Sequence, residues 1–383
     1  MSRTLVVTND FPPRPGGIQT FVDELLRRLP DGEVVVLASS WRGSAEHDAD
    51  YPHPVVRYPR RLMLPTPDVS RLARGLLAEH GCTRVLFGAA APLGLLAGPL
   101  RAAGAQRLVG LTHGHEAGWA GLPGSRQLLR RSAAGLDVLT YLTEYTRERI
   151  AAAVGPRQAA SMRQLTPGVA TDRFTPSVDG SGVRRRWGLG DDPVVACVSR
   201  LMPRKGQDTL VGVLPALRQA VPGTRLLLVG GGPERDRLAR LAAALGVADA
   251  VVLTGSVPPA DLPALYAAGD VFAMPCRTRL RGLDVEGLGI VFLEASASGL
   301  PVVAGRSGGA PDAVEDQVSG LVVDGSDAEA VRRALVGLLG DPPRAAAMGE
   351  AGVRWAGQWT WQRSAQRLTA LLDGQDPDAE GVS

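Results

Sequence analysis

Short runs of apolar residues alternate along the chain with segments in which apolar residues recur every three or four positions. In the first half, apolar runs typical of buried strands cover 5–8, 34–37, 85–87, 108–112 and 138–142. Helical periodicity falls between them, at 18–29, 69–79 and 126–134. Buried runs separated by helices are typical of a parallel sheet with helices on its faces. The first half therefore predicts an α/β domain.

The same alternation returns in the second half after an interruption. Pro, Gly, Ser and Asp cluster at 166–176 (TPGVATDRFTP) and 179–182 (DGSG), where we place the connection between domains. Beyond it, strands are expected at 194–198, 225–229, 250–254, 271–274, 301–304 and 320–323. Helices are expected between them at 208–220, 234–245, 259–268 and 290–298. The second half predicts another domain of the same kind.

A long helix is expected near the C-terminus, with Trp355, Trp359 and Trp361 at its start and Leu372 at its end. The predicted fold class is α/β, with two doubly wound Rossmann-like domains whose strand ends face a cleft between them. We expect domains at 1–170 and 171–355, a helix at 356–375 that returns to the first domain, and a flexible tail at 376–383.

Composition agrees with a packed globular protein, because 45% of the 383 residues are hydrophobic and 21% are charged. The apolar run near the N-terminus is too short for a signal peptide, and no stretch reaches the roughly 18 to 20 apolar residues of a membrane span. The three cysteines are far apart and form no C-x-x-C pair. These features predict a cytoplasmic protein with reduced thiols.

Charge is distributed unevenly. Residues 1–165 contain 20 arginines against 14 acidic residues, whereas the rest of the chain is slightly acidic. A basic half can attract nucleic acid or an anionic membrane, although a solvated arginine-rich surface explains it equally well. Lys205 is the single lysine of the sequence. Its site is therefore the first place to ask whether a compact ammonium is needed where a planar guanidinium does not serve.

The segment SRLMPRKG follows a predicted strand and precedes a predicted helix, so Arg200 and Lys205 lie on a loop at a strand end. Two cations there suit a diphosphate. Negative charge that builds on a departing phosphate is stabilised by fixed cations more than the ground state is. Such cations can replace a metal, while the simpler alternative is a solvated basic loop.

The segment DVEGLGIVFLEA joins two acidic residues through glycines and the start of a helix. Glu286 lies in the loop, Gly287 and Gly289 allow close approach of a ligand, and the amides near Ile290 open the helix. Glu294 can accept hydrogen bonds from a vicinal diol such as ribose, and Glu286 can accept them from sugar hydroxyls. Two ordinary exposed acids are the alternative.

In the first half, LVGLTHGHE ends a predicted strand with His113, His115 and Glu116. Two histidines beside a glycine at a strand end favour a catalytic or substrate contact over a structural role. A zinc site needs a further ligand, and no H-E-x-x-H or C-x-x-C motif supplies one, so we expect no metal and no cofactor. Gly16 and Gly17 form a second glycine loop that can admit a phosphate or a sugar, or can simply turn the chain.

Other nucleotide-binding patterns are missing. The glycines of GGGPE at 230–234 lack the G-x-G-x-x-G spacing of a dinucleotide site, and Lys205 has no Walker A glycines before it. The D-x-D pairs at 48–50 and 376–378 do not follow predicted strands. A nicotinamide oxidoreductase and a metal-held nucleotide sugar are both disfavoured.

Together, the R-x4-K of SRLMPRKG and the E-x7-E of EGLGIVFLE resemble the family-four retaining glycosyltransferases of GT-B fold. The PRPGGIQ loop, the THGHE strand end and the PGVATDRFTP linker resemble the same family, so the likeness spans nearly the whole chain. In the linker, Pro167 and Ala170 replace the Asn and Asp of the family pattern. That departure concerns a structural segment.

Closer still, the runs THGHEAGWAGLPGSRQLLRR and PCRTRLRGLDVEGLGIVFLEA resemble the actinobacterial phosphatidylinositol mannoside mannosyltransferases, among them those that add the second mannose. This resemblance implies GDP-mannose as donor, a phosphatidylinositol mannoside glycolipid as acceptor, and a peripheral position at the inner face of the membrane. It implies that the first domain binds the acceptor and the second the nucleotide sugar. It implies no nucleic-acid partner and leaves the oligomeric state open.

The resemblance also assigns roles to residues. Arg200 and Lys205 hold the diphosphate, Glu294 the ribose and Glu286 the transferred hexose, while His113 lies near the reacting carbon. The expected donor-binding residues further include Gly16, Gly17, Val257, Gly287, Gly289 and Ile290. The expected contacts to the acceptor or the membrane are Gln19, His115, Glu116, Arg126, Arg130 and Arg131. Since no nucleophile is evident, retention implies departure and attack on one face of the sugar.

The segment 126–131 supports a membrane contact on its own. It combines Arg126, Arg130 and Arg131 with Leu128 and Leu129, and a basic helix with an apolar side can lie on anionic lipid. An ordinary helix packed on the core fits the pattern about as well.

Two other functions stay open. One is transfer from UDP-glucose or UDP-N-acetylglucosamine to a small or polysaccharide acceptor, because the base is read partly by backbone near 255–257, which side chains do not reveal. The other is a catalytically silent protein of the same fold that only binds a nucleotide. Turnover of the donor would exclude the second, and product analysis with several donors would decide the first.

Overall fold

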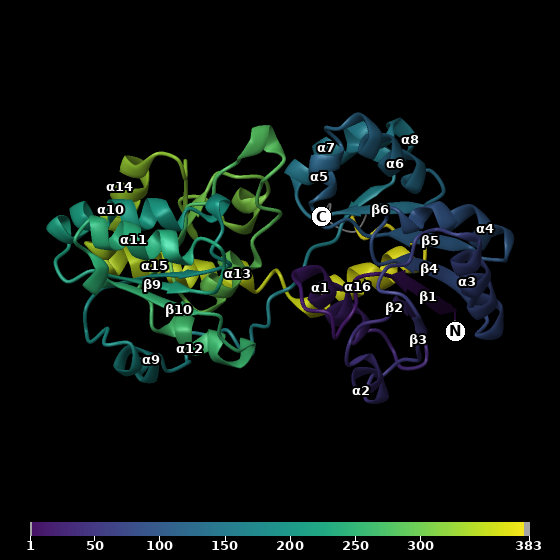
Figure 1. Cartoon of the computed structure of the whole chain (residues 1–383), viewed down its shortest axis with the longest axis horizontal. Coiled ribbons are helices and arrows are strands. Elements are labelled where there is room, and N and C mark those ends of the chain that lie inside the picture. The colour runs from purple at the N-terminus through teal and green to yellow at the C-terminus, as the bar shows by residue number, and fades with distance from the viewer. Residues whose placement is uncertain (1, 379–383) are drawn as a thin grey trace. The chain divides into compact units, whose positions relative to one another are not determined.

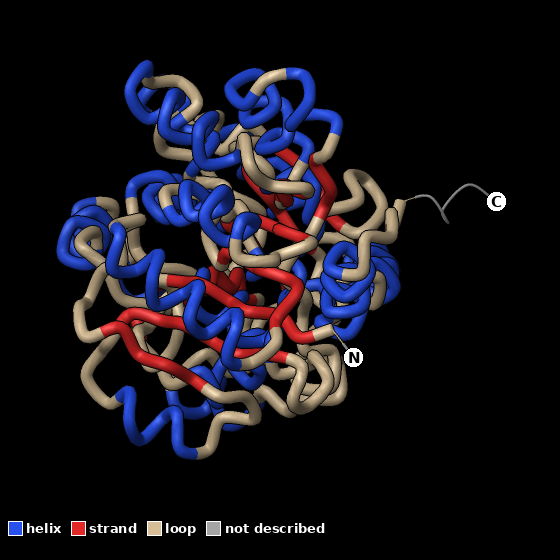
Figure 2. Tube along the Cα trace, turned by 90° about the vertical axis from the view of Figure 1, so that its right-hand side faces the viewer, coloured by secondary structure: helices blue, strands red, loops and turns tan. Residues whose placement is uncertain are grey.

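The computed structural model describes residues 2–378, which form two compact units (Figure 1). Unit 1 contains the chain up to Pro167 together with the segment from Trp361 onward, and unit 2 runs from Gly168 to Thr360. Each unit is built on a parallel sheet, and Figure 2 shows helices on both sides of the strands. The predicted α/β class with two Rossmann-like domains is confirmed.

Unit 1 has a seven-stranded parallel sheet within the described residues, in the order β3-β2-β1-β4-β5-β6-β7. The strands are β1 (Arg3–Thr8), β2 (Val34–Ser39), β3 (Val55–Tyr58), β4 (Cys82–Phe87), β5 (Arg107–Gly110), β6 (Val138–Tyr141) and β7 (Met162–Gln164). The apolar pattern missed β3 and β7, which are the two edge strands. All four residues of β3 and two of the three in β7 are only half-buried. Arg57 interrupts the apolar residues of β3, and β7 contains only one apolar residue, Met162, so neither strand has a continuous apolar run.

The helices of unit 1 are α1 (Gly17–Leu26), α2 (Ser44–Ala49), α3 (Pro67–Glu79), α4 (Ala97–Ala102), α5 (Glu116–Trp119), α6 (Pro123–Ala133), α7 (Glu144–Val154), α8 (Pro156–Ala160) and α16 (Trp361–Leu372). Their starts follow local rules. The Thr66 side chain accepts a hydrogen bond from the Val69 amide at the start of α3, where Pro67 fits the first turn. Thr143 and Thr146 form a capping box at the start of α7.

Unit 2 has a six-stranded parallel sheet within the described chain, in the order β10-β9-β8-β11-β12-β13. The strands are β8 (Val194–Val198), β9 (Arg225–Val229), β10 (Val251–Gly255), β11 (Val271–Met274), β12 (Val302–Gly305) and β13 (Gly320–Val323). The helices are α9 (Ser181–Arg186), α10 (Gln207–Ala220), α11 (Arg235–Ala244), α12 (Leu262–Ala267), α13 (Ile290–Ala297), α14 (Ala328–Leu339) and α15 (Pro342–Ala356).

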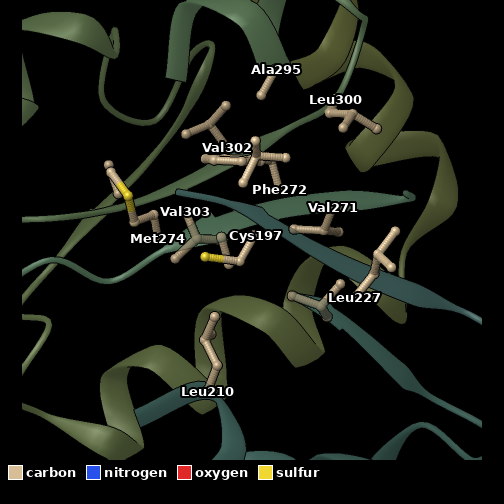
Figure 3. Close-up of a cluster of buried hydrophobic side chains, with 14 of the residues drawn as sticks. Cys197, Leu210, Leu227, Val271, Phe272, Met274, Ala295, Leu300, Val302 and Val303 are labelled. Carbon is tan, nitrogen blue, oxygen red and sulfur yellow. The ribbon is translucent and has the colours of Figure 1, made fainter. Parts of the chain in front are cut away.

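The core of unit 2 fixes the positions of the strand ends. Val271, Phe272 and Met274 of β11 are fully buried, together with Cys197 of β8 (Figure 3). The order of the strands reverses between β8 and β11, because the chain leaves β8 toward β9 on one side and returns to β11 on the other. Loops diverge at such a switch point and leave a crevice at the carboxyl ends of the strands.

The C-terminal segment differs from the single long helix that the sequence suggested. Helix α15 ends at Ala356 and α16 begins at Trp361, so Trp355 lies in α15, Trp361 starts α16, and Trp359 lies in the break between them with Gly357. Helix α16 packs against α1, β4 and β5, and Arg107 Nε donates to the carbonyl of Leu371 at 2.9 Å.

Two residues of the tail that we expected to be flexible form ion pairs with unit 1. Asp376 forms an ion pair with Arg163 at 2.6 Å, and Asp378 forms one with Arg367 at 2.5 Å. The rest of the expected tail, 379–383, lies outside the described residues.

Candidate active site

The basic loop of unit 2 leaves the end of β8 and enters α10 through a short 3-10 turn, Pro203–Lys205. Arg200 is exposed at the start of this loop, whereas Lys205 is 8% exposed. Gly206 has a φ of 77°, and a Cβ atom there would lie 2.1 Å from the carbonyl oxygen of Pro275. Only glycine permits this approach. The basic loop therefore packs directly against the segment that follows β11.

Lys205 and Glu286 form a buried ion pair. The ammonium Nζ lies 2.6 Å from Glu286 Oε2, and both residues are less than a tenth exposed. The angle does not satisfy hydrogen-bond geometry, so Oε2 has no hydrogen-bond partner among the described residues although the charges are in contact. Arg204 Nε lies 3.9 Å from the same oxygen. Glu286 therefore faces two cations from the basic loop.

Hydrogen bonds to the loop after β12 hold the backbone at Glu286. The Gly309 amide donates to the Glu286 carbonyl at 3.0 Å, and the Glu286 amide donates to Ser307 Oγ at 3.4 Å. Gly289 then adopts a φ of 78° and starts α13, whose first residue Ile290 is half-buried. The first-turn amides of α13 thus follow a loop that carries a buried carboxylate, as the sequence predicted for Gly287, Gly289 and Ile290. No contact of these three residues tests their expected role in binding.

Glu294 lies one turn into α13 and has a partner that the sequence did not reveal. The Tyr266 hydroxyl of α12 donates to Glu294 Oε2 at 2.7 Å, and the Tyr266 side chain is fully buried. Burial raises the pKa of Glu294 above its ordinary value, while the hydrogen bond from Tyr266 opposes that shift. Burial also raises the pKa of Tyr266 well above its usual range. Tyr266 is therefore a permanent donor that fixes one oxygen of this carboxylate.

A hollow of about 460 Å³ opens beside the basic loop of unit 2. Its lining consists of Val198, Ser199, Arg200, Val229, Gly230, Gly231, Gly232, Ser256, Val257 and Leu262. Val257 lies where the sequence placed base recognition. The three glycines, which fail as a dinucleotide motif, instead form a wall: a Cβ on Gly232 would lie 2.3 Å from the Leu201 carbonyl oxygen. These glycines lie close to the backbone of the basic loop. A search for dinucleotide motifs could not reveal that contact.

A second hollow, of about 410 Å³, lies at the opposite ends of the strands in unit 2. Its two acidic residues are Asp191 and Asp270. Asp270 already accepts a hydrogen bond from the Val194 amide at 2.7 Å and from Arg184 at 2.8 Å. None of the motif residues lines this second hollow, whereas Arg200 lines the first.

In unit 1, His113 follows β5 with its ring half-buried. Its Nε2 lies 2.5 Å from the carbonyl oxygen of Gly88. A carbonyl only accepts, so Nε2 carries the proton and Nδ1 is left as an acceptor. Burial lowers the pKa of His113 below its ordinary value, an effect that the nearby Glu116 charge partly offsets. The ring is therefore neutral near pH 7.

Two residues that we expected to contact the acceptor are buried instead. Glu116 is fully buried, and its Oε2 accepts from the His113 amide at 2.9 Å. Gln19 is 6% exposed and donates to Asp10 Oδ1 at 2.7 Å. Both side chains bind to their own loops, and their expected contact with the acceptor stays a prediction. His115 differs because its side chain is 42% exposed, with Nε2 3.5 Å from Glu116 Oε1.

The glycines of the N-terminal loop have different surroundings. A Cβ on Gly16 would lie 2.1 Å from Gln19 Oε1, whereas one on Gly17 would meet nothing within 4 Å. Gly16 therefore has a structural reason for its small size, which is to make room for the buried Gln19. Gly17 has open space and keeps only its predicted role.

Helix α6 presents its arginines to solvent, since Arg126, Arg130 and Arg131 are all exposed. Arg126 also donates to the carbonyl of Ala152 at 2.9 Å. Leu129 is 0% exposed and Leu128 is half-buried, so these leucines do not form the apolar side that the sequence suggested. The exposed face of α6 is basic.

Among the described residues, no helix is both long enough and apolar enough to cross a membrane. No group of three or more His, Cys, Asp or Glu side chains in that part of the chain could hold a metal ion. Cys82, Cys197 and Cys276 are all buried and unpaired with one another.

Family models match both units. Residues 15–173 match the model of Glycosyltransferase Family 4, and residues 183–355 match Glycosyl transferases group 1. Together with a relative that is 55% identical over 97% of the chain, these matches show that the chain belongs to the family-four glycosyltransferases and is an enzyme of that class.

Within that family, two relatives are described as GDP-mannose-dependent mannosyltransferases. A GDP-mannose-dependent alpha-(1-6)-phosphatidylinositol monomannoside mannosyltransferase of Mycolicibacterium smegmatis is 55% identical over 97% of this chain and 98% of the relative. The corresponding Corynebacterium glutamicum enzyme, described for the monoacylated form of the same acceptor, is 45% identical over 97% of this chain and 98% of the relative.

Solved structures agree on the fold. HepE from Anabaena, crystallised in complex with UDP, superposes with a TM-score of 0.80 over 97% of this chain and 100% of that chain. Its sequence is 21% identical, so the likeness concerns the GT-B architecture.

Proposed function

We propose that this enzyme transfers mannose from GDP-mannose to a phosphatidylinositol mannoside, with retention of the anomeric configuration and without a metal. The single observation that carries the proposal is the cluster on unit 2: an exposed Arg200, a Lys205–Glu286 pair at 2.6 Å, and a hollow of about 460 Å³ that Arg200 also lines. Two relatives that are 45% and 55% identical over nearly the whole chain are both described as GDP-mannose-dependent and as acting on a phosphatidylinositol monomannoside, which supports the choice of donor and acceptor.

In this proposal, different residues of the cluster bind different parts of the donor. Arg200 and Lys205 bind the diphosphate, and their charges stabilise it more strongly as it leaves. The diphosphate draws Lys205 from Glu286, whose carboxylate then accepts hydrogen bonds from the hexose. Glu294, steadied by Tyr266, accepts them from the ribose diol.

The bond from the anomeric carbon to the phosphate oxygen breaks, and a bond from that carbon to the acceptor hydroxyl oxygen forms on the same face. The acceptor proton passes to the departing phosphate oxygen. This step needs no enzymatic nucleophile. The first-turn amides of α13 and the glycines before them provide donors for the phosphate oxygens.

We propose that His113 contacts the transferred hexose through the neutral ring described above. Its fixed Nε2 proton leaves Nδ1 as the acceptor for a sugar hydroxyl, unless the main chain beside Gly114 supplies the contact. We keep Gly17 as a contact of the nucleotide sugar, because a Cβ there would meet nothing within 4 Å. We keep His115 as a contact of the acceptor lipid, because its side chain is 42% exposed.

The acceptor lies in a membrane, so we propose a peripheral position at the inner face of the cell membrane. The exposed arginines of α6 support this position, since basic helices bind anionic lipid even with little apolar surface.

The test is incubation of the purified enzyme with GDP-mannose and phosphatidylinositol monomannoside, followed by mass analysis of the lipid. We expect a lipid heavier by one hexose. Turnover of UDP-glucose or UDP-N-acetylglucosamine in place of GDP-mannose would overturn the donor. Binding of nucleotide without any turnover would show a catalytically silent protein.

A further inference from the structure

A tight hairpin lies on unit 2 between β11 and Glu286. The Arg279 amide donates to the Asp284 carbonyl at 2.9 Å, and the Asp284 amide donates back to the Arg279 carbonyl at 3.2 Å. The four residues between them, 280–283, form its tip. We call this segment the 279–284 hairpin. It ends two residues before the carboxylate that we assign to the hexose.

The tip exposes apolar side chains that the core does not use. Leu280 is 65% exposed, the largest value for a large hydrophobic side chain in the described chain, and Leu283 is 49% exposed. Arg281 between them is also exposed and has no ion-pair partner within the described residues. The tip therefore presents two leucines on either side of a free guanidinium.

The backbone of the tip is unusual. Leu280 and Arg281 have φ values of 50° and 54°, in the left-handed region that L-residues with side chains avoid. Such residues persist only where the surrounding structure holds them, and they cluster where a protein contacts ligands or partners. Glycine would relieve this conformation, yet the sequence places glycine only at the third position, Gly282.

Two ion pairs hold the base of the hairpin. Asp284 lies 3.5 Å from Arg204 through Oδ1 and 3.4 Å from Arg279 through Oδ2. Arg204 also approaches Glu286 Oε2 at 3.9 Å. The base is thus bound to the basic loop of the donor cluster, while the tip forms no ion pair with any residue that the structure describes.

We propose that the 279–284 hairpin is a lipid-contacting tip, in which Leu280 and Leu283 enter the interface of an anionic bilayer and Arg281 binds lipid phosphates. The proposal rests on the proposed function, because a glycolipid acceptor brings the enzyme to such a surface. Charge complementarity favours this occupant: leucines beside an unpaired cation match a headgroup layer, where apolar and anionic groups lie within a few ångströms. Through Arg204 and the short connection to Glu286, lipid contact steadies the hexose-binding carboxylate.

The experiment measures partition of the full-length protein onto vesicles of phosphatidylcholine alone and of phosphatidylcholine with phosphatidylinositol. The variants are Leu280→Ser with Leu283→Ser, and separately Arg281→Ser. Leu245→Ser serves as the matched control, because Leu245 is 39% exposed on the same unit. Turnover with a water-soluble acceptor and thermal melting are measured for each variant.

We expect the double leucine variant to bind anionic vesicles about tenfold more weakly than the wild type, from the loss of apolar burial. Arg281→Ser should lose roughly fivefold on anionic vesicles and nothing on neutral ones. Melting and soluble-acceptor turnover should stay unchanged. Unaltered partition of the leucine variant would overturn the proposal, and so would an equal loss in Leu245→Ser.

Failure of this proposal and failure of the proposed function are separable. If the wild type makes no mannosylated lipid, the function is wrong whatever the vesicles show. If the wild type makes it and the hairpin variants partition normally, only the hairpin proposal is wrong. Loss of soluble-acceptor turnover without loss of vesicle binding would indicate a contact with protein or acceptor sugar, and would also overturn it.

Discussion

Lys205 differs from the arginines around it because its ammonium reaches a carboxylate that is almost fully enclosed. The Nζ to Oε2 distance of 2.6 Å places a compact charge where a planar guanidinium has a different reach and shape. This geometry gives a reason for the single lysine of the sequence.

Replacing Lys205 tests this reason. We expect Lys205→Ala to lower kcat by about 100-fold or more, which is typical for loss of a charge that stabilises a leaving group, with the fold intact by circular dichroism. Lys205→Arg should recover only part of the activity. Full activity in the arginine variant would show that charge alone is needed at this position.

Tyr266 is a positioning residue for Glu294, since its hydroxyl donates to that carboxylate at 2.7 Å. We expect Tyr266→Phe to raise the KM for the donor about tenfold with kcat little changed. Loss of the Tyr266 hydrogen bond to the charged carboxylate raises the pKa of Glu294 further. As pH falls, Glu294 is then protonated sooner, so binding of the nucleotide sugar should be lost at a higher pH than in the wild type. An unchanged pH profile of kcat/KM would contradict this role.

The sequence identified the charged members of the site but not their partners. Glu286 and Glu294 stand out because glycines and a helix start surround them. Tyr266 lies 28 residues before Glu294, on another helix, and only the packing of α12 and α13 beside β11 brings the two together. The burial of Gln19 and Glu116 could not be predicted either. A polar residue next to a motif has the same sequence pattern whether its side chain faces a ligand or its own loop.

Among the elements, helix α6 carries the membrane prediction. Its arginines are exposed but Leu129 is in the core, so attraction to lipid must be mainly electrostatic. We expect Arg130→Ser with Arg131→Ser to weaken binding to anionic vesicles roughly tenfold at low salt, and the difference to shrink as salt rises.

The matched control for α6 is Arg235→Ser with Arg240→Ser on α11, which removes two exposed arginines from unit 2. Equal losses in both double variants would mean that net charge, not α6, governs binding. Unchanged partition of the α6 variant onto vesicles would show that α6 does not contribute to membrane binding.

Strands with continuous apolar runs in the sequence were predicted well, and those without such runs were not. All six strands of the described unit 2 sheet were anticipated, because each contains at least four consecutive apolar or small residues. The edge strands β3 and β7 escaped detection, and so did the break between α15 and α16. The left-handed tip at Leu280 and Arg281 had no sequence signal, since neither residue type favours that conformation.

At the scale of the whole molecule, the proposed reaction requires that cations of the protein replace a metal at the diphosphate. We expect turnover to survive treatment with excess EDTA and to gain less than twofold from added Mg²⁺ or Mn²⁺, as Arg200 and Lys205 already supply two positive charges. Loss of activity with the chelator, and its return with one metal, would show that the basic loop is insufficient.

The central claim is tested most directly by following labelled mannose from donor to lipid. The enzyme is incubated with GDP-mannose labelled with carbon-13 at the anomeric carbon and with phosphatidylinositol monomannoside, and the lipid is analysed by mass and by NMR. We predict one labelled mannose per product, with the one-bond carbon–proton coupling of an α-anomer. A β-linked product, release of the label as free mannose only, or transfer from a uridine donor alone would contradict the account.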